Sequence, residues 1–218
     1  MFAYPKQAEF NRVLPKNKIY GYAKPSRKVQ AQFVDEVDQI IWRFKLAPET
    51  INLPVRGHVR ELQVFDLVLK HGDFSEDVLR TIDKTIIHPI FYQIHHGKRV
   101  RFAAAYKRPS EADAEKWVVS DYFITDWQPA NTTFPSLPVA LDLNALYEQM
   151  LRAHITTPAR QGETLRKQVE RIGQIRQMER EAVQLEVQMH QKKQFSRKVE
   201  LNAQLRRLKS DIRTLYTT

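Results

Sequence analysis

The sequence predicts a mixed α/β or α+β body followed by a basic helical arm. Apolar patterns between Val37 and Trp127 indicate a mixed sheet of about five strands with two or three helices. From Leu165 onward, apolar residues recur three and four positions apart, as they do in packed helices. We therefore expect a globular body over residues 1–157 and an arm, folded as a helical hairpin or coiled coil, over residues 158–218.

Two segments carry the clearest strand patterns. The segment Val37–Leu46 alternates from Ile40 onward, because apolar residues occupy every second position. Val59–Lys70 is apolar on both faces, which is typical of a strand in the middle of a sheet. The alternating residues of the first segment are expected to share one face of their strand: Ile40, Trp42, Phe44 and Leu46.

Before and after these strands the sequence predicts short helices and turns. Residues 1–30 suggest a short helix at Ala8–Val13 and a turn at Pro25 and Ser26. After the second strand, Ser75 is a good N-cap for a helix. The buried stripe of this helix consists of Val78, Leu79, Ile82 and Ile86.

The second half of the body is predicted to be a hairpin, one more strand and a capped helix. Ile90–His95 and Arg99–Tyr106 flank a turn at His96 and Gly97, as in a β-hairpin. Trp117–Trp127 predicts a further strand, and Asp142 can cap the last helix of the body.

The arm is predicted to begin at Thr157 and Pro158, an N-cap followed by the first helical residue. Its apolar register breaks within His190–Arg197. This break favours two helices folded as a hairpin, and a stutter in one long helix is the alternative.

Composition excludes several classes of protein. The 218 residues contain no Cys, which excludes disulfides, thiolate zinc sites and a cysteine nucleophile. Only six Gly are present, and no phosphate-binding loop, dinucleotide fingerprint or nucleophile elbow occurs. The sequence also lacks a secretion signal and a membrane-spanning stretch. We therefore expect a cytoplasmic protein that does not engage membranes and needs no cofactor.

The positive charge is concentrated in the arm. Arg160–Thr218 holds 14 Lys and Arg against 7 Asp and Glu, whereas the preceding residues hold 21 against 18. The second half of the arm is the most basic part, and its only acids are Glu200 and Asp211. Such an excess predicts a docking surface for nucleic acid or an acidic partner, although cations also solubilise exposed helices. The candidate binding residues are Lys192, Lys193, Arg197, Lys198, Arg206, Arg207, Lys209 and Arg213.

One group of residues imitates a catalytic metal site. Restriction-endonuclease-like nucleases hold Mg²⁺ with an acid on one strand and an acid-x-Lys or acid-x-Gln triplet on the next. Asp38, or Asp35, together with Glu61 and Gln63 matches that layout, so a Mg²⁺-dependent nuclease is the alternative function. The other interpretation is that Glu61 and Gln63 lie at a solvated strand end. No further metal site is expected, because neighbouring histidines such as His95 and His96 face opposite sides of a strand.

Several segments together resemble a bacterial and archaeal family built on a domain of unknown function (DUF4391-like). The resemblance covers roughly residues 1–155 and extends to the predicted helical tail. The resemblance implies a gene in the setting typical of that family, beside helicases and DNA methyltransferases in restriction-like, phage-defence gene clusters. The segments that carry the resemblance are Pro15–Lys18 followed by a tyrosine, Ile41–Leu53, Glu61–Phe65 and Ile82–Ile86.

The resemblance implies a context and no catalytic residue. Together with the charge asymmetry it predicts a non-enzymatic accessory subunit of a defence or DNA-processing complex. The body would dock onto a helicase or DNA methyltransferase, and the arm would contact DNA or that partner. A homodimer formed through the arm, with charge serving only solubility, is a third interpretation.

Overall fold

The computed structural model describes residues 2–113, 116–191 and 194–217, and the chain divides into two compact units. The first unit is Met1–Thr156 and the second is Thr157–Thr218. Across the described ranges there are seven strands and seven α-helices, and no helix combines the length and the apolar composition needed to cross a bilayer. The chain is therefore a mixed α/β protein, as predicted, with more strands and helices than the pattern indicated.

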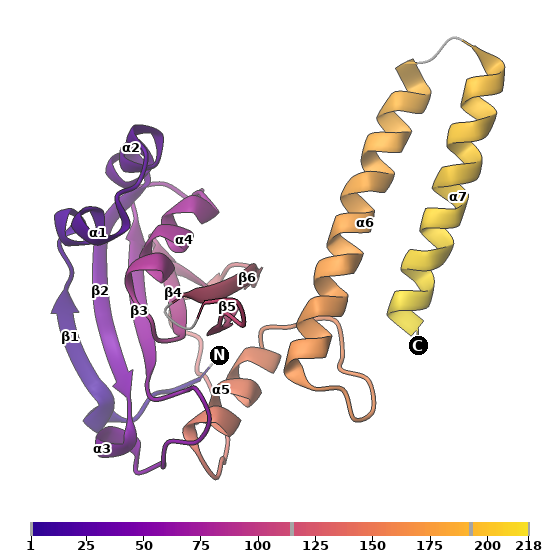
Figure 1. Cartoon of the computed structure of the whole chain (residues 1–218). Helices are drawn as coiled ribbons and strands as arrows, with labels where there is room; N and C mark the ends of the chain where they lie inside the picture. The colour runs from indigo at the N-terminus through magenta and orange to yellow at the C-terminus, as the bar shows by residue number, and fades with distance from the viewer. Residues whose placement is uncertain (1, 114–115, 192–193, 218) are drawn as a thin grey trace. The chain divides into compact units, whose positions relative to one another are not determined.

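The first unit is built on one mixed sheet of seven strands in the described chain, with the order β1-β2-β3-β4-β5-β6 and with β7 paired to β5 (Figure 1). All neighbouring strands are antiparallel except β3 and β4, which are parallel and joined by the crossover helix α4. The strands are β1 (Glu9–Val13), β2 (Val37–Leu46), β3 (Leu62–Leu69), β4 (Ile90–His96), β5 (Arg99–Pro109), β6 (Trp117–Ile124) and β7 (Gln128–Pro129). The helices are the 3-10 helix η1 (Lys6–Ala8), α1 (Lys16–Ala23), α2 (Arg27–Glu36), α3 (Pro48–Ile51), α4 (Glu76–Thr85) and α5 (Leu143–Arg152).

The N-terminal segment differs from the prediction. Residues Glu9–Val13 form the edge strand β1 instead of the predicted helix over Ala8–Val13. Pairing with β2 decides this, because Val13 lies opposite Ile41 and the ladder outweighs the weak helix propensity of so short a segment. The helices α1 and α2 were not predicted, although Ser26, at the predicted turn, caps α2 by accepting a hydrogen bond from the Val29 N–H.

A register shift in β2 changes which residues share a face. Trp42 pairs with Phe65 and Phe44 pairs with Val64, so one extra residue is inserted in β2 between them. Phe65 and Val64 follow one another on β3 and point to opposite faces, and therefore Trp42 and Phe44 do as well. The predicted common face of the four alternating residues is wrong for this reason.

The two faces of the sheet are covered by different helices. Side chains of α1, α2 and α4 cover one face around Phe65 and Tyr92, which are both buried. On the other face, Tyr147 of α5 contacts the ring of Phe91 with 6.1 Å between centroids and accepts a hydrogen bond from the backbone N–H of Lys107. The central position predicted for β3 is confirmed, since β2 and β4 flank it and nearly all of its residues are buried.

Both predicted capping residues of the body are confirmed. Ser75 accepts a hydrogen bond from the Asp77 N–H at the start of α4, and Asp142 accepts one from the Ala145 N–H at the start of α5. The predicted β-hairpin is also present as β4 and β5, with Gly97 in the turn at a φ of 57°.

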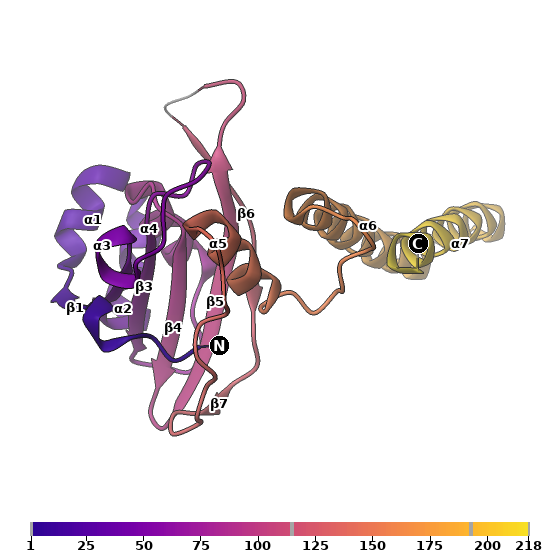
Figure 2. The same cartoon turned by 90° about the horizontal axis from the view of Figure 1, so that it is seen from below.

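The second unit contains two long helices, α6 (Leu165–Gln191) and α7 (Phe195–Thr217). They lie side by side and run antiparallel (Figure 1, Figure 2), with Glu186 beside Lys209 and Glu179 beside Tyr216. The two-helix interpretation of the register break therefore describes this unit. The second unit begins at Thr157, but the helix start predicted at Thr157 and Pro158 is wrong, because α6 begins only after Thr164, whose hydroxyl accepts a hydrogen bond from the Lys167 N–H.

Candidate nucleic-acid interface and other sites

The basic residues predicted as a docking surface lie along α7. Arg197, Arg206, Arg207, Lys209 and Arg213 are exposed, and Lys198 is half-buried. Lys192 and Lys193 fall outside the described residues. The apolar stripe of α7 faces α6 through Leu201 and Leu205, which are both buried.

Two of these cations are neutralised by carboxylates. Arg197 Nη1 lies 2.6 Å from Glu200 Oε2, and Lys209 Nζ lies 2.6 Å from Glu186 Oε1 on α6. Both ion pairs are exposed, so each contributes only about 0–1 kcal/mol and can open without unfolding the unit.

The remaining cations of α7 are not engaged within the part of the chain that the structure describes. There, no carboxylate lies within 4.0 Å of Arg206, Arg207, Arg213 or Lys198. Arg206 and Arg213 stand seven residues apart, two helical turns, so they share one side of α7. Arg207 lies on another side with Glu181 and Asp211 around it. The surface therefore offers cations in several directions around α7.

The base of the hairpin holds a buried ion pair that sequence reasoning missed. Arg171 Nη2 lies 2.8 Å from Glu163 Oε2, and the two side chains are only 5% and 7% exposed. Arg171 also donates to the carbonyl of Leu215, and Arg160 donates to the same carbonyl at 2.9 Å. The bond to Arg171 lowers the pKa of Glu163 to about 2.

These contacts cap the end of α7. The last carbonyls of a helix lack intrahelical donors and carry partial negative charge, so arginines at that end satisfy and stabilise them. Arg160 and Arg171 belong to the basic tail by composition, but they hold the hairpin together. Sequence reasoning could not separate them from the exposed cations, because the carbonyls they bind lie more than forty residues away.

Of the three residues of the predicted nuclease site, Glu61 and Gln63 lie together and Asp38 does not. Gln63 Nε2 donates to Glu61 Oε1 at 2.5 Å, and Lys45 Nζ lies 3.4 Å from Glu61 Oε2. Asp38 lies at the other end of the β2–β3 ladder, because Leu46 pairs with Leu62 whereas Val37 pairs with Leu69.

That end is on the order of 25 Å away, at about 3.3 Å per strand residue. Asp35 is at the same distant end, beside His71. Over the described residues, no group of three or more His, Cys, Asp or Glu side chains could hold a metal ion.

A second buried charge, the ammonium of Lys107, lies in the body, and each of its three N–H donors has an acceptor. Lys107 Nζ donates to Asp83 Oδ1 at 3.2 Å and also to the carbonyls of Asp83 and Ile86. The hydroxyls of Tyr92 and Tyr122 both donate to Asp83 Oδ2. Burial lowers the pKa of Lys107, which the carboxylate of Asp83 partly offsets. This network is structural, since all three donors of the Lys107 ammonium are used within it.

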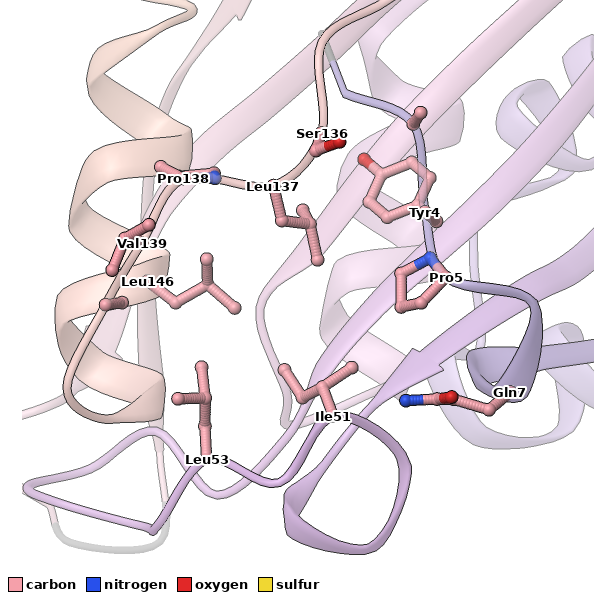
Figure 3. Close-up of a pocket in the computed structure, with 12 residues that line it drawn as sticks. Tyr4, Pro5, Gln7, Ile51, Leu53, Ser136, Leu137, Pro138, Val139 and Leu146 are labelled. Carbon is pink, nitrogen blue, oxygen red and sulfur yellow. The ribbon is translucent and has the colours of Figure 1, made fainter.

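An apolar hollow of about 490 Å³ lies on the body (Figure 3). In Figure 3, Ile51, Leu53, Leu137 and Leu146 point into it from three separate segments. Val139, which lines the hollow, and Leu141, two residues further along the chain, are 94% and 81% exposed, which is unusual for apolar side chains so close in sequence. The remaining lining residues are Ala3, Tyr4, Pro5, Gln7, Ser136, Pro138, Val139 and Ala140.

Fold and sites together define a mixed α/β body with an apolar hollow, joined in one chain to a basic helical hairpin. The chain belongs to the family described as Domain of unknown function (DUF4391), which matches residues 2–212 and so spans both units. No curated protein and no solved structure matches the chain.

Proposed function

We propose that the protein is a non-enzymatic accessory subunit of a phage-defence or DNA-processing complex, in which the hairpin binds DNA. The observation that carries this proposal is the set of exposed cations on α7 without carboxylate partners among the described residues. Each such cation can neutralise one phosphate and release a condensed counterion. The resemblance to proteins encoded beside helicases and DNA methyltransferases supplies the context.

A salt titration of duplex DNA binding tests this role. In full-length protein, Arg206→Gln with Arg213→Gln removes two cations that form no ion pair with a described residue, whereas Arg197→Gln with Lys209→Gln removes two that are paired. We expect the first variant to reduce the slope of log K against log salt by about 2, since each lost phosphate contact changes it by about 0.9. The second variant serves as the matched control and is expected to change it less. Equal, salt-insensitive binding by wild type and both variants would rule out the DNA role of the hairpin.

For the body we propose a protein partner, a helicase or DNA methyltransferase subunit from the same gene cluster. The apolar hollow beside Val139 and Leu141 supports this role, since a concave apolar site with an exposed apolar rim is suited to an anchoring side chain. Copurification of that subunit should be lost in Val139→Asp with Leu141→Asp. It should persist in Val34→Asp, which alters an apolar side chain that is 59% exposed on α2. Retention of the partner by the first variant would contradict this docking surface.

A further inference from the structure

The small net charge of the body conceals a strong internal asymmetry. Residues 1–30 contain seven Lys and Arg against the single acid Glu9, whereas residues 31–159 contain fourteen against seventeen. The body is therefore a slightly acidic sheet domain that carries a basic N-terminal segment.

The fold gathers most of these cations on one surface. Lys18 and Lys24 are exposed on and just after α1, and Arg27 and Lys28 are exposed in the first turn of α2. Both helices pack on α4 (Figure 1), which brings Lys84 to the same place. We name these five residues the N-terminal basic surface.

A small polar hollow lies within this surface. It measures about 280 Å³, and its polar lining is Lys24, Ser26, Asp77, Arg80, Thr81 and Lys84. Arg80 already binds Asp121 at 3.2 Å, so Lys24 and Lys84 are the cations available there, against the single carboxylate of Asp77. The hollow is therefore large enough for a phosphate-sized group and has two lysines in its lining.

None of the five cations forms an ion pair with another described residue. No carboxylate of the described residues lies within 4.0 Å of any of them, whereas Lys45, Arg43 and Lys107 elsewhere in the body each have an acidic partner. Cations grouped on one surface without acidic partners raise the local positive potential, which attracts an anion.

An exposed aromatic ring distinguishes the kind of anion. Tyr22 is 79% exposed and lies four residues after Lys18, so the two side chains share one face of α1. A phenol ring flanked by cations stacks on an unpaired base while the cations contact the neighbouring phosphates. An acidic protein segment supplies no such base, and the bases of a duplex are already stacked.

We propose that the N-terminal basic surface, with Tyr22, binds single-stranded nucleic acid. The N-terminal basic surface belongs to the body and not to the hairpin. Its binding of single-stranded nucleic acid can therefore be tested separately from the proposed duplex binding. It would give the protein one surface for a duplex and another for a displaced strand.

The test uses full-length protein with Arg206→Gln, Arg207→Gln and Arg213→Gln as background, so that the remaining binding reports on the body. The probe is a fluorescent oligothymidylate at low salt. Lys24→Gln with Arg27→Gln and Lys28→Gln is expected to weaken binding at least tenfold and to reduce the salt slope by about 2, at about 0.7 per phosphate. The matched control removes three exposed cations elsewhere on the body, Lys6→Gln, Arg12→Gln and Lys98→Gln, and should retain most of the affinity.

Tyr22 provides the second readout. Tyr22→Ala should weaken oligothymidylate binding by about tenfold, and Tyr22→Phe should restore it, because base stacking needs only the ring. All these side chains are exposed, so the melting temperature should not change.

Three outcomes overturn the proposal. The first is equal loss of affinity in the triple variant and its matched control. The second is competition by polyglutamate of equal charge as effective as that by unlabelled oligothymidylate, which would indicate an acidic protein partner. The third is tighter binding of a duplex than of the single strand in this background.

Discussion

In the body, the ammonium of Lys107 donates to two carbonyls and to the carboxylate of Asp83. The hydroxyls of Tyr92 and Tyr122 donate to the same carboxylate. In the hairpin, the guanidinium of Arg171 is held by Glu163 and by carbonyls of Pro158 and Leu215. Each unit thus keeps one charged pair out of water and supplies it with several hydrogen bonds, which offset the cost of desolvation.

The exposed cations of the two units differ from these buried ones. Those of α7 and of the N-terminal basic surface contribute little to folding, because exposed charges are screened by solvent. The comparison separates cations that hold the structure from cations that are available to a partner. Net charge alone does not make this distinction, because both kinds add equally to it.

The largest effect is expected at the buried pair of the body. Asp83→Asn should lower the free energy of unfolding by about 3–5 kcal/mol, because it leaves the Lys107 ammonium buried without a counter-charge. Urea denaturation followed by near-UV circular dichroism measures this loss. The control Glu49→Gln breaks the exposed pair with Lys45 and should cost far less, because solvent screens that pair. Equal losses would show that burial does not set the value of these pairs.

The next largest effect is expected at the base of the hairpin. Glu163→Gln should destabilise the second unit by about 3 kcal/mol, since Arg171 keeps its carbonyl partners but loses the carboxylate. Hydrogen exchange should accelerate at amides of α6 and α7 and remain unchanged in β3. Glu170→Gln, which breaks an exposed pair with Arg166, is the control. Faster exchange in β3 as well would contradict a stabilising role of this pair that is confined to the hairpin.

Acid should affect the body before the hairpin. Burial lowers the pKa of His154, which contacts the carbonyl of Met150, from 6.5 to about 4. Between these values the unfolded chain binds the proton and the folded one does not, so stability present above pH 6.5 is lost as the pH falls to 4. We expect roughly 3 kcal/mol from this histidine, at about 1.4 kcal/mol per pKa unit.

The matching measurement compares the free energy of unfolding of wild type and His154→Phe between pH 6.5 and 4. Carboxylates titrate in both proteins, so their effect cancels in the difference. In the hairpin, the lowered pKa of Glu163 places the corresponding loss between pH 4.5 and about 2. Parallel curves for wild type and variant between pH 6.5 and 4 would contradict the buried, neutral state of His154.

The smallest effect on stability is expected on α7. Arg206→Gln, Arg207→Gln and Arg213→Gln together should change the free energy of unfolding by less than about 0.5 kcal/mol, because the side chains are exposed and make no ion pair with a described residue. Thermal unfolding of the second unit measures this. A large loss would mean that these cations support the hairpin, as Arg171 does.

Local signals predicted several elements correctly. Ser75 and Asp142 cap the helices they were expected to cap, because capping depends on a few adjacent residues. The two-sided apolar run of β3 marked a central strand, and the register break after Met189 marked the end of α6. The strand at Glu9–Val13 and the inserted residue in β2 were missed, since both depend on pairing with a neighbour far along the chain.

The candidate sites also contain features that the sequence predicted and features that depend on contacts between distant residues. The sequence located the basic residues of α7, but it could not show that Arg160 and Arg171 are engaged while Arg206 and Arg213 are not. It also grouped Asp38 with Glu61, which the antiparallel pairing of β2 and β3 separates.

By itself the sequence determined the mixed α/β class, the helical C-terminal region and its excess of positive charge. These depend on periodicity and composition, which are properties of short segments. The tertiary structure alone decided which charges are buried with partners, which remain exposed, and where the apolar hollow lies. Those features depend on contacts between residues distant in the chain, and burial changes the energy of a charge more than its identity does.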